Sequence, residues 1–154
     1  MECWEPSSDR RTDTEQNAKQ TRNIMEKLLY EKESYLIIGG AFEIYKQFRN
    51  RHKEIVYLRA YSSYLKDKGL FIETEKQIPV YFNGKKVGIY TPDIIVNNCI
   101  FIELKCKPKL SQDDIKQFWY YLKATDYKIG FLINFGASNG VEFIRRIYDS
   151  ARKK

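Results

Sequence analysis

Three charged side chains interrupt two neighbouring apolar segments near the middle of the chain. The first segment, TPDIIV, carries Asp93, and the second, CIFIELK, carries Glu103 and Lys105. Apolar runs of this length on either side of an Asn-Asn pair predict two β-strands joined by a turn. Charged side chains are seldom fully buried unless they are paired or bind a metal, because taking a charge out of water is costly. This strand pair must therefore contribute to a core and also hold two acids and a lysine.

Helices are predicted ahead of the strand pair. Residues 1–14 have mixed charges and few apolar side chains, and we expect a flexible tail there. From residue 15 to about residue 50 apolar residues recur at helical spacing, and Gly39-Gly40 predicts close packing or a break. A further helix is predicted from about residue 53 to residue 68. The front half of the chain is therefore expected to be helical.

Strands and two more helices are predicted in the second half. The pair Asn83-Gly84 between two extended runs is the strongest short hairpin signal. After the CIFIELK strand, Ser111 marks the start of a helix, the run IGFLINF predicts a buried strand, and a last helix is expected from about Gly140. These elements together predict an α/β fold in which helices flank a mixed sheet.

Length and charge limit the classes of protein that remain. A chain of 154 residues is long enough for one compact domain, which we expect over residues 15–154. The net charge is +7, and between Leu104 and Lys154 eleven basic residues stand against five acidic ones. A polyanion such as nucleic acid would fit this surplus, but charge alone favours an ordinary solvated surface.

The sequence also carries expectations about location. No apolar run approaches the roughly 18 to 20 residues needed to cross a bilayer, and the N-terminal residues lack the apolar core of a signal peptide. Cys3, Cys99 and Cys106 form no CxxC pair, which predicts reduced thiols. We therefore expect an intracellular, cytoplasmic protein that is not secreted and binds no membrane, with a nucleoid or virion location left open. The oligomeric state is open, with a homodimer among the options.

The alternation of side chains along a strand indicates what the three charges could do together. Glu103 and Lys105 project to one face of their strand, and Asp93 lies on the neighbouring strand, within reach of Glu103. Two close carboxylates repel each other unless a cation lies between them, and Mg²⁺ commonly takes one or two carboxylates together with waters and phosphate oxygens. An ion pair on an exposed sheet face would need no metal, and acid-x-Lys occurs three times in the chain. On spacing alone, both interpretations stay open.

The order of these motifs resembles the PD-(D/E)XK nuclease superfamily. TPDIIV and FIELK fit its motif, and the similarity is closer to its GxxExxY family over residues 34–148, where YLIIGGAFEIYKQF resembles the opening helix and KIGFLINFG the last core strand. The resemblance implies a restriction-endonuclease-like core with a mixed four-stranded sheet flanked by helices. It also implies a metal-dependent nuclease that uses Mg²⁺ or Mn²⁺ and acts on nucleic acid, most readily DNA.

Residue roles follow from the same resemblance. Asp93 and Glu103 would be metal ligands, and Lys105 would be the catalytic lysine. The motif that names the GxxExxY family falls on RHKEIVY, where Glu54 and Tyr57 match and Arg51 replaces the glycine. Glu54 would then be the third metal-binding acid. Glu43 is a rival for the role of Glu54.

Four further residues are expected around the site. Gln117 and Tyr121 match the Q-x-x-x-Y pattern of many superfamily members, and their spacing places them on one face of a helix. Lys107 and Lys109 would contact phosphates at the mouth of the site. Two other functions stay open because fold does not imply function: a non-catalytic nucleic-acid-binding or packaging protein, and a protein-interaction module.

Overall fold

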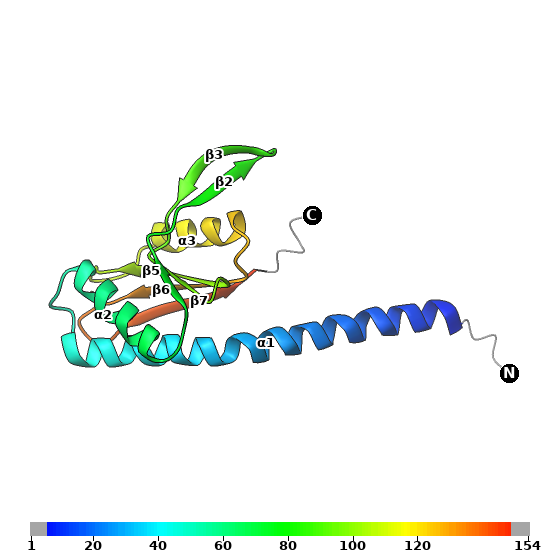
Figure 1. Cartoon of the computed structure of the whole chain (residues 1–154), viewed down its shortest axis with the longest axis horizontal. Coiled ribbons are helices and arrows are strands. Elements are labelled where there is room, and N and C mark those ends of the chain that lie inside the picture. Colours follow the sequence, from blue (N-terminus) through cyan, green and yellow to red (C-terminus); the bar gives the residue numbers. More distant parts are fainter. Residues whose placement is uncertain (1–5, 149–154) are drawn as a thin grey trace. The chain divides into compact units, whose positions relative to one another are not determined.

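A computed structural model describes residues 6–148, which form an α/β fold with two helices first, then five strands, a third helix and two further strands. The elements are α1 (Pro6–Phe48), α2 (Glu54–Asp67), β1 (Ile72–Thr74), β2 (Ile78–Phe82), β3 (Lys85–Tyr90), β4 (Ile94–Val96), β5 (Ile100–Lys105), α3 (Gln112–Ala124), β6 (Ile129–Asn134) and β7 (Glu142–Ile147) (Figure 1).

The chain divides into two units, residues 1–35 and residues 36–154. The described part of the first unit is helical from Pro6 onward, so α1 includes much of the segment expected as a tail over residues 1–14. Residues 1–5 lie outside the described residues. The sheet and the candidate site belong to the second unit.

The main sheet is mixed and has the strand order β1-β4-β5-β6-β7. Strands β5 and β6 pair in parallel, and the other neighbours in this sheet are antiparallel. Every residue of β6, IGFLIN, is buried, as expected for a central strand that is covered on both faces. The expected fold class, a mixed sheet flanked by helices, is confirmed.

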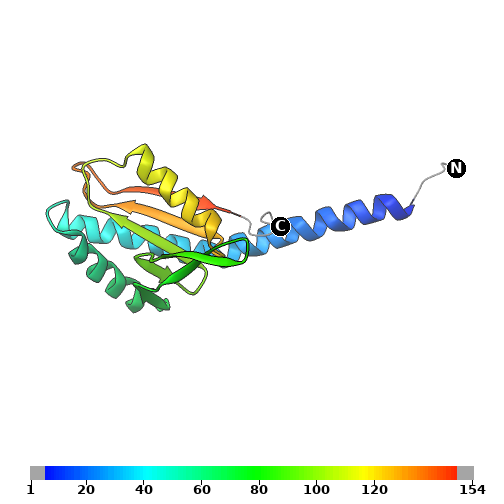
Figure 2. The same cartoon turned by 90° about the horizontal axis from the view of Figure 1, so that it is seen from above.

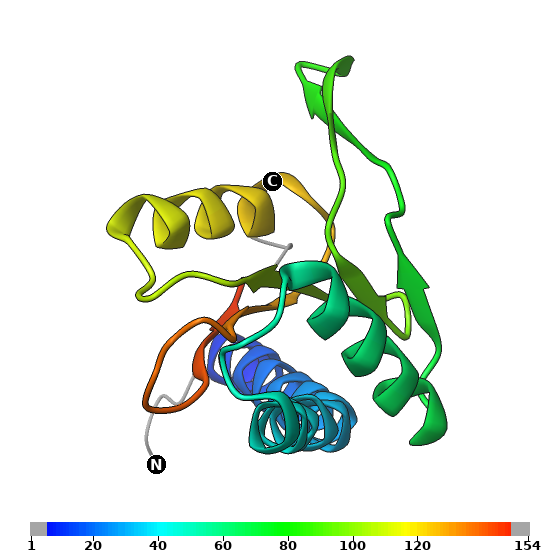
Figure 3. The same cartoon turned by 90° about the vertical axis from the view of Figure 1, so that its left-hand side faces the viewer.

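Helices cover the sheet from both sides (Figure 3). On one side, Phe118 and Leu122 of α3 pack with Phe101 of β5 in a buried apolar cluster. On the other side lie α2 and the last turns of α1, where the ring of Tyr57 stacks on Phe135 with ring centroids 4.7 Å apart. The central strands are therefore buried on both faces. In β5 only Glu103 and Lys105, near the end of the strand, are partly exposed.

Gly39 and Gly40 lie within α1, which continues without a break to Phe48. The close packing that was the other expectation is present at Gly40, where a Cβ atom would lie 2.8 Å from the ring of Tyr64. A glycine here allows α1 and α2 to approach closely.

The prediction of a C-terminal helix from about Gly140 is wrong. Residues 142–147 form β7, which pairs with β6 along its whole length (Figure 2). The physical reason is that β6 would otherwise present an unpaired edge of N–H and C=O groups in the core. The sheet consequently has five strands rather than the expected four.

The expected hairpin is present, but it is separate from the main sheet. Asn83 and Gly84 both have positive φ, as the tight turn requires, and join β2 to β3 in a two-stranded sheet of its own. The chain leaves the main sheet at Glu75, with φ of 57°, and returns after Pro92, which has no N–H to donate. Each of the two extended runs is thus split into two strands, the first into β1 and β2 and the second into β3 and β4. β1 pairs with β4 in the main sheet, and β2 pairs with β3 in the hairpin.

Candidate active site

Asp93 and Glu103 lie opposite each other on neighbouring strands. The β4–β5 register pairs Ile94 with Ile102, so Asp93, one residue earlier, faces Glu103, one residue later. The Oδ2 atom of Asp93 accepts a hydrogen bond from the backbone N–H of Leu104 at 2.7 Å. The carboxylate of Asp93 is therefore held against β5, next to the strand residue that it was expected to meet.

Burial and mutual repulsion change the acidity of both carboxyl groups. Burial raises the pKa of Glu103 to about 7, and the negative charge of Asp93 adds to the effect. Burial also raises the pKa of Asp93, against the hydrogen bond from Leu104 and the positive charge of Lys105. A second acid beside a half-buried acid favours either a proton or an added cation at this point.

Glu54 interacts with the same group of charges from the first position of α2. Burial raises the pKa of the Glu54 carboxyl group, the charge of Asp93 raises it further, and Lys105 opposes both. The structure thus brings the three acids expected from the sequence within electrostatic range of Lys105. The rival acid, Glu43, is exposed on α1.

These acids do not form a ready metal cage. Among residues 6–148, no three His, Cys, Asp or Glu side chains are placed so that they could hold one ion together. Mg²⁺ commonly needs only one or two carboxylates from the protein and takes its other ligands from water and substrate. The pair Asp93 and Glu103, whose pKa values are both raised, fits that requirement.

Tyr90 connects the acids to α3, a role that the sequence did not indicate. Its hydroxyl group donates a hydrogen bond of 2.6 Å to Oε1 of Glu103. Its ring stacks on Tyr121, with centroids 3.7 Å apart and planes 9° apart. Tyr121, expected near the site, therefore reaches Glu103 through Tyr90, while Gln117, one turn earlier, is exposed. In the sequence, the only feature that could have indicated this role is that Tyr90 is an aromatic residue three positions before Asp93.

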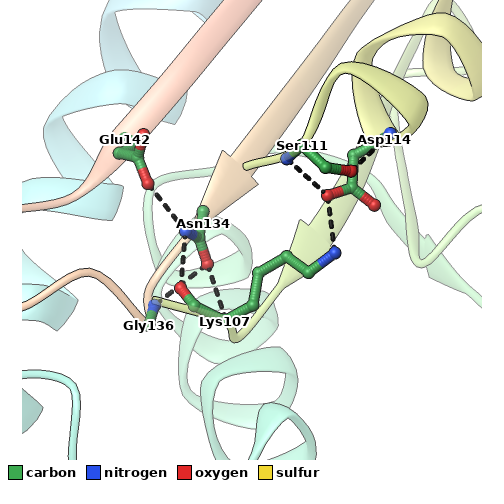
Figure 4. A network of polar contacts seen from close by, with 6 residues as sticks. All are labelled: Lys107, Ser111, Asp114, Asn134, Gly136 and Glu142. Atoms are coloured by element: carbon green, nitrogen blue, oxygen red, sulfur yellow. Dashed lines mark hydrogen bonds and ion pairs between the residues drawn. The ribbon is translucent and has the colours of Figure 1, made fainter. Parts of the chain in front are cut away.

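Lys107 is held in the loop between β5 and α3 by an ion pair (Figure 4). Its Nζ atom lies 2.6 Å from Oδ2 of Asp114, which also accepts a hydrogen bond from the N–H of Ser111. The hydrogen bond from Lys107 lowers the pKa of Asp114 to about 2. The charge of Lys107 is therefore already compensated at the N-terminus of α3, whereas Lys109 is exposed.

Asn134 fixes the same loop from the end of β6 (Figure 4). Its Oδ1 atom accepts hydrogen bonds from the N–H groups of Lys107 and Gly136, and its Nδ2 atom donates to Lys107 O and Glu142 Oε1. The side chain is completely buried, and all of its polar capacity is used. Because Asn134 pairs with Lys105 in the β5–β6 register, it anchors the chain directly after the site.

A groove of about 410 Å³ lies between α2 and the end of β1. It is lined by Ile55, Leu58, Arg59, Ser62, Ser63, Lys66, Asp67, Thr74 and Glu75. Ile55 follows Glu54 in the chain, and the charge of Glu75 raises the pKa of Asp93. None of Glu54, Asp93 and Glu103 is among the residues that line the groove.

The sequence profile described as the PD-(D/E)XK nuclease superfamily matches residues 31–147, most of the chain. The chain belongs to the PD-(D/E)XK nuclease superfamily. Within this PD-(D/E)XK protein, the matched region includes the strand pair with Asp93, Glu103 and Lys105 as well as both covering helices. No curated protein matches the chain.

Two solved structures are similar to this PD-(D/E)XK protein. An alkaline exonuclease (LHK-Exo) from Laribacter hongkongensis is 16% identical with a TM-score of 0.44, over 64% of this chain and 58% of its own. A structure titled SSO0001 is 22% identical with a TM-score of 0.43, over 64% of this chain and 52% of its own. The chain therefore spans between half and three fifths of the length of each.

Proposed function

We propose that this PD-(D/E)XK protein is a metal-dependent nuclease that hydrolyses phosphodiester bonds in nucleic acid, with DNA as the preferred substrate. The observation that carries the proposal is the juxtaposition of Asp93 and Glu103, with burial raising the pKa of Glu103 to about 7. Two carboxylates that repel each other beside a lysine are suited to binding a divalent cation. Membership of the superfamily supports a nucleic-acid substrate.

Each residue of the site has a proposed role. Asp93 and Glu103 would hold Mg²⁺ or Mn²⁺. Glu54, at the start of α2, would not be a third ligand in this arrangement, but its carboxyl group interacts electrostatically with Asp93 and would add negative charge beside the cation. When bound, the cation supplies positive charge next to the phosphate and makes it more susceptible to attack by water. The ammonium group of Lys105 donates hydrogen bonds to a phosphate oxygen, whose negative charge increases in the transition state.

Two residues hold Glu103 and Asp93 in place for these roles. The Tyr90 hydroxyl group donates a hydrogen bond to one oxygen of the Glu103 carboxyl group, which fixes its orientation. The N–H of Leu104 does the same for Asp93. Ligands that are held by the protein lose less freedom on binding, and the pair is thus preorganised.

The GxxExxY family is our proposed place for the chain within the superfamily. Glu54 and Tyr57 support it, because Glu54 interacts with Asp93, and Tyr57 of α2 is buried with its ring stacked on Phe135. A cytoplasmic location and a homodimer stay predictions from the sequence. None of the helices within residues 6–148 is long and apolar enough to cross a membrane.

The deciding experiment measures cleavage of plasmid DNA, single-stranded DNA and RNA with Mg²⁺, with Mn²⁺ and with EDTA. The wild type should cut only with a divalent metal. Asp93→Asn and Lys105→Ala should each reduce the rate by about 100-fold or more. Asp126→Asn is the matched control, since Asp126 is an exposed acid two positions before Lys128, the same spacing as that of Glu103 and Lys105.

Cleavage that persists in both site variants would contradict the proposal and indicate a contaminating nuclease. Absence of cleavage together with salt-sensitive binding that survives Asp93→Asn would assign the protein to the non-catalytic nucleic-acid-binding class. Absence of both would leave the protein-interaction module as the better interpretation of the fold.

A further inference from the structure

The β2–β3 hairpin projects from the domain and exposes apolar side chains that no packing explains. It forms a two-stranded sheet separate from the main sheet, and its tip extends beyond α3 (Figures 1 and 3). Tyr81 is 61% exposed and Phe82 is 67% exposed, and Val87 and Ile89 are also exposed. Large apolar side chains that gather on a free ribbon usually mark a surface that meets a partner.

The charges of the hairpin select the kind of partner. Between Lys76 and Pro92 the chain has three lysines and no acidic residue. Lys76 pairs with Glu73 at 3.4 Å, but within residues 6–148 neither Lys85 nor Lys86 forms an ion pair. A ribbon with uncompensated positive charge fits a polyanion better than an ordinary protein surface.

The register of the hairpin places each tip aromatic beside a lysine. Tyr81 lies opposite Lys86, and Phe82 lies opposite Lys85. Residues that face each other across a strand pair share a face, and consecutive residues lie on opposite faces. Each face of the tip therefore presents one aromatic ring and one ammonium group. This combination suits single-stranded nucleic acid, whose bases stack on rings while its phosphates meet cations.

The hairpin is also joined directly to the proposed catalytic acids. β3 ends at Tyr90, which donates a hydrogen bond to Glu103, and Asp93 follows three residues later. The base of the ribbon is anchored, because Tyr90 is buried and Val80 packs against the same core cluster. The five residue steps from Tyr90 to Lys85 span about 17 Å, which matches about five stacked nucleotides.

We propose that the β2–β3 hairpin is a nucleic-acid-binding arm that stacks unpaired bases on Tyr81 and Phe82 and neutralises their phosphates with Lys85 and Lys86. The arm holds the strand about five nucleotides away from the bond that is cut. This inference deepens the proposed nuclease function and rests on it, although binding to the arm is measurable without cleavage.

The test measures binding of a labelled 20-nucleotide single strand by fluorescence anisotropy, in an Asp93→Asn background that prevents cutting. Phe82→Ala should weaken binding by about tenfold, and Phe82→Trp should retain the affinity of the parent because the ring is kept. The matched control is Tyr120→Ala, which removes an aromatic side chain of similar exposure, 62%, from α3. Thermal unfolding should be the same for all of these proteins, since the side chains are exposed.

The lysines are tested by the salt dependence of the same binding. In Lys85→Ala/Lys86→Ala, the slope of log K against log salt should fall by about 1.4, or about 0.7 for each phosphate that a lysine no longer neutralises. The charge-matched control is Lys32→Ala/Lys46→Ala, two exposed lysines of α1. In the active protein, the arm variants should slow cleavage of the 20-nucleotide strand by about tenfold and leave cleavage of a four-nucleotide strand unchanged.

The outcomes separate the arm from the nuclease. Arm variants that bind like their controls, while the parent binds well, would overturn the arm and leave the nuclease intact. Arm variants that change only the oligomeric state in light scattering would also overturn it, because the ribbon would then be a protein interface. Weaker binding by the arm variants of a protein that never cuts would support the arm and refute the nuclease. A wild type that binds no nucleic acid would overturn both.

Discussion

Replacement of Glu103 by glutamine should stabilise the metal-free protein at pH 8 and leave its stability unchanged at pH 4. In the folded protein, burial and the nearby Asp93 raise the pKa of Glu103 to about 7 from an ordinary 4.5. Between these two values the folded state binds more protons than the unfolded state. The free energy of unfolding contributed by this group therefore falls as the pH rises through that window.

The size of the effect follows from the separation of the two pKa values. The difference between about 7 and 4.5, at about 1.4 kcal/mol for each pH unit, corresponds to about 3 kcal/mol. This cost is fully present above pH 7 and absent below about pH 4. Glutamine has nearly the same shape, carries no charge, and its amide oxygen accepts the hydrogen bond from Tyr90. We expect a gain of about 2 to 3 kcal/mol at pH 8.

Urea unfolding in EDTA, at pH 4 and pH 8, measures this difference directly. Glu43→Gln is the control, because Glu43 is an exposed acid on α1, and it should change the free energy of unfolding equally little at both values. A gain in Glu103→Gln that does not depend on pH would refute the reasoning. Addition of Mg²⁺ at pH 8 should then raise the stability of the wild type and not that of Glu103→Gln. Equal stabilisation of both proteins would exclude Glu103 as a ligand.

Two further predictions concern the residues that hold the site in position. Tyr90→Phe keeps the stacked ring but removes a hydrogen bond that lowers the pKa of Glu103. The acidic limb of the pH–rate profile should therefore move to higher pH, and the rate should fall by about tenfold. An acidic limb that does not move would show that the hydroxyl group does not act on Glu103. Gly136→Ala would place a Cβ atom 2.2 Å from the backbone N of Lys107 and should cost about 1 to 3 kcal/mol in urea unfolding. In contrast, Gly39→Ala, with nothing within 4 Å in a helix, should stabilise by up to about 1 kcal/mol, and equal effects would contradict the packing argument.

The parts of the fold that depend on neighbours in the chain could be predicted from the sequence. Asn83-Gly84 and Asn97-Asn98 adopt positive φ at the expected turns, and Ser111 caps α3 with Asp114 in a reciprocal capping box. Turn and cap preferences are set within a few residues, so a local pattern contains the information. Strand alternation likewise placed Glu103 and Lys105 on one face, because its period is a property of the backbone.

The C-terminal strand and the split hairpin could not be predicted in this way. The segment of β7 forms a strand only because β6 offers an edge to pair with, and that edge exists only after the sheet has formed. The hairpin leaves the main sheet at Glu75, which has a positive φ. Because Glu75 is neither glycine nor asparagine, no local pattern predicts a turn at this position. Pairing between distant segments is decided by the hydrogen bonds and burial that they gain together.

For the site, the sequence by itself determined which charged residues lie on which strands, and so the acids Asp93 and Glu103 and the lysine Lys105. Only the tertiary structure decided how the acids are held: Tyr90 bonds Glu103, Leu104 bonds Asp93, and Lys107 is taken up by Asp114 rather than left free. The physical reason is one of range. A strand's alternation is fixed by its own backbone, whereas a hydrogen bond or a raised pKa depends on which groups the complete fold brings within a few ångströms and how much water it removes.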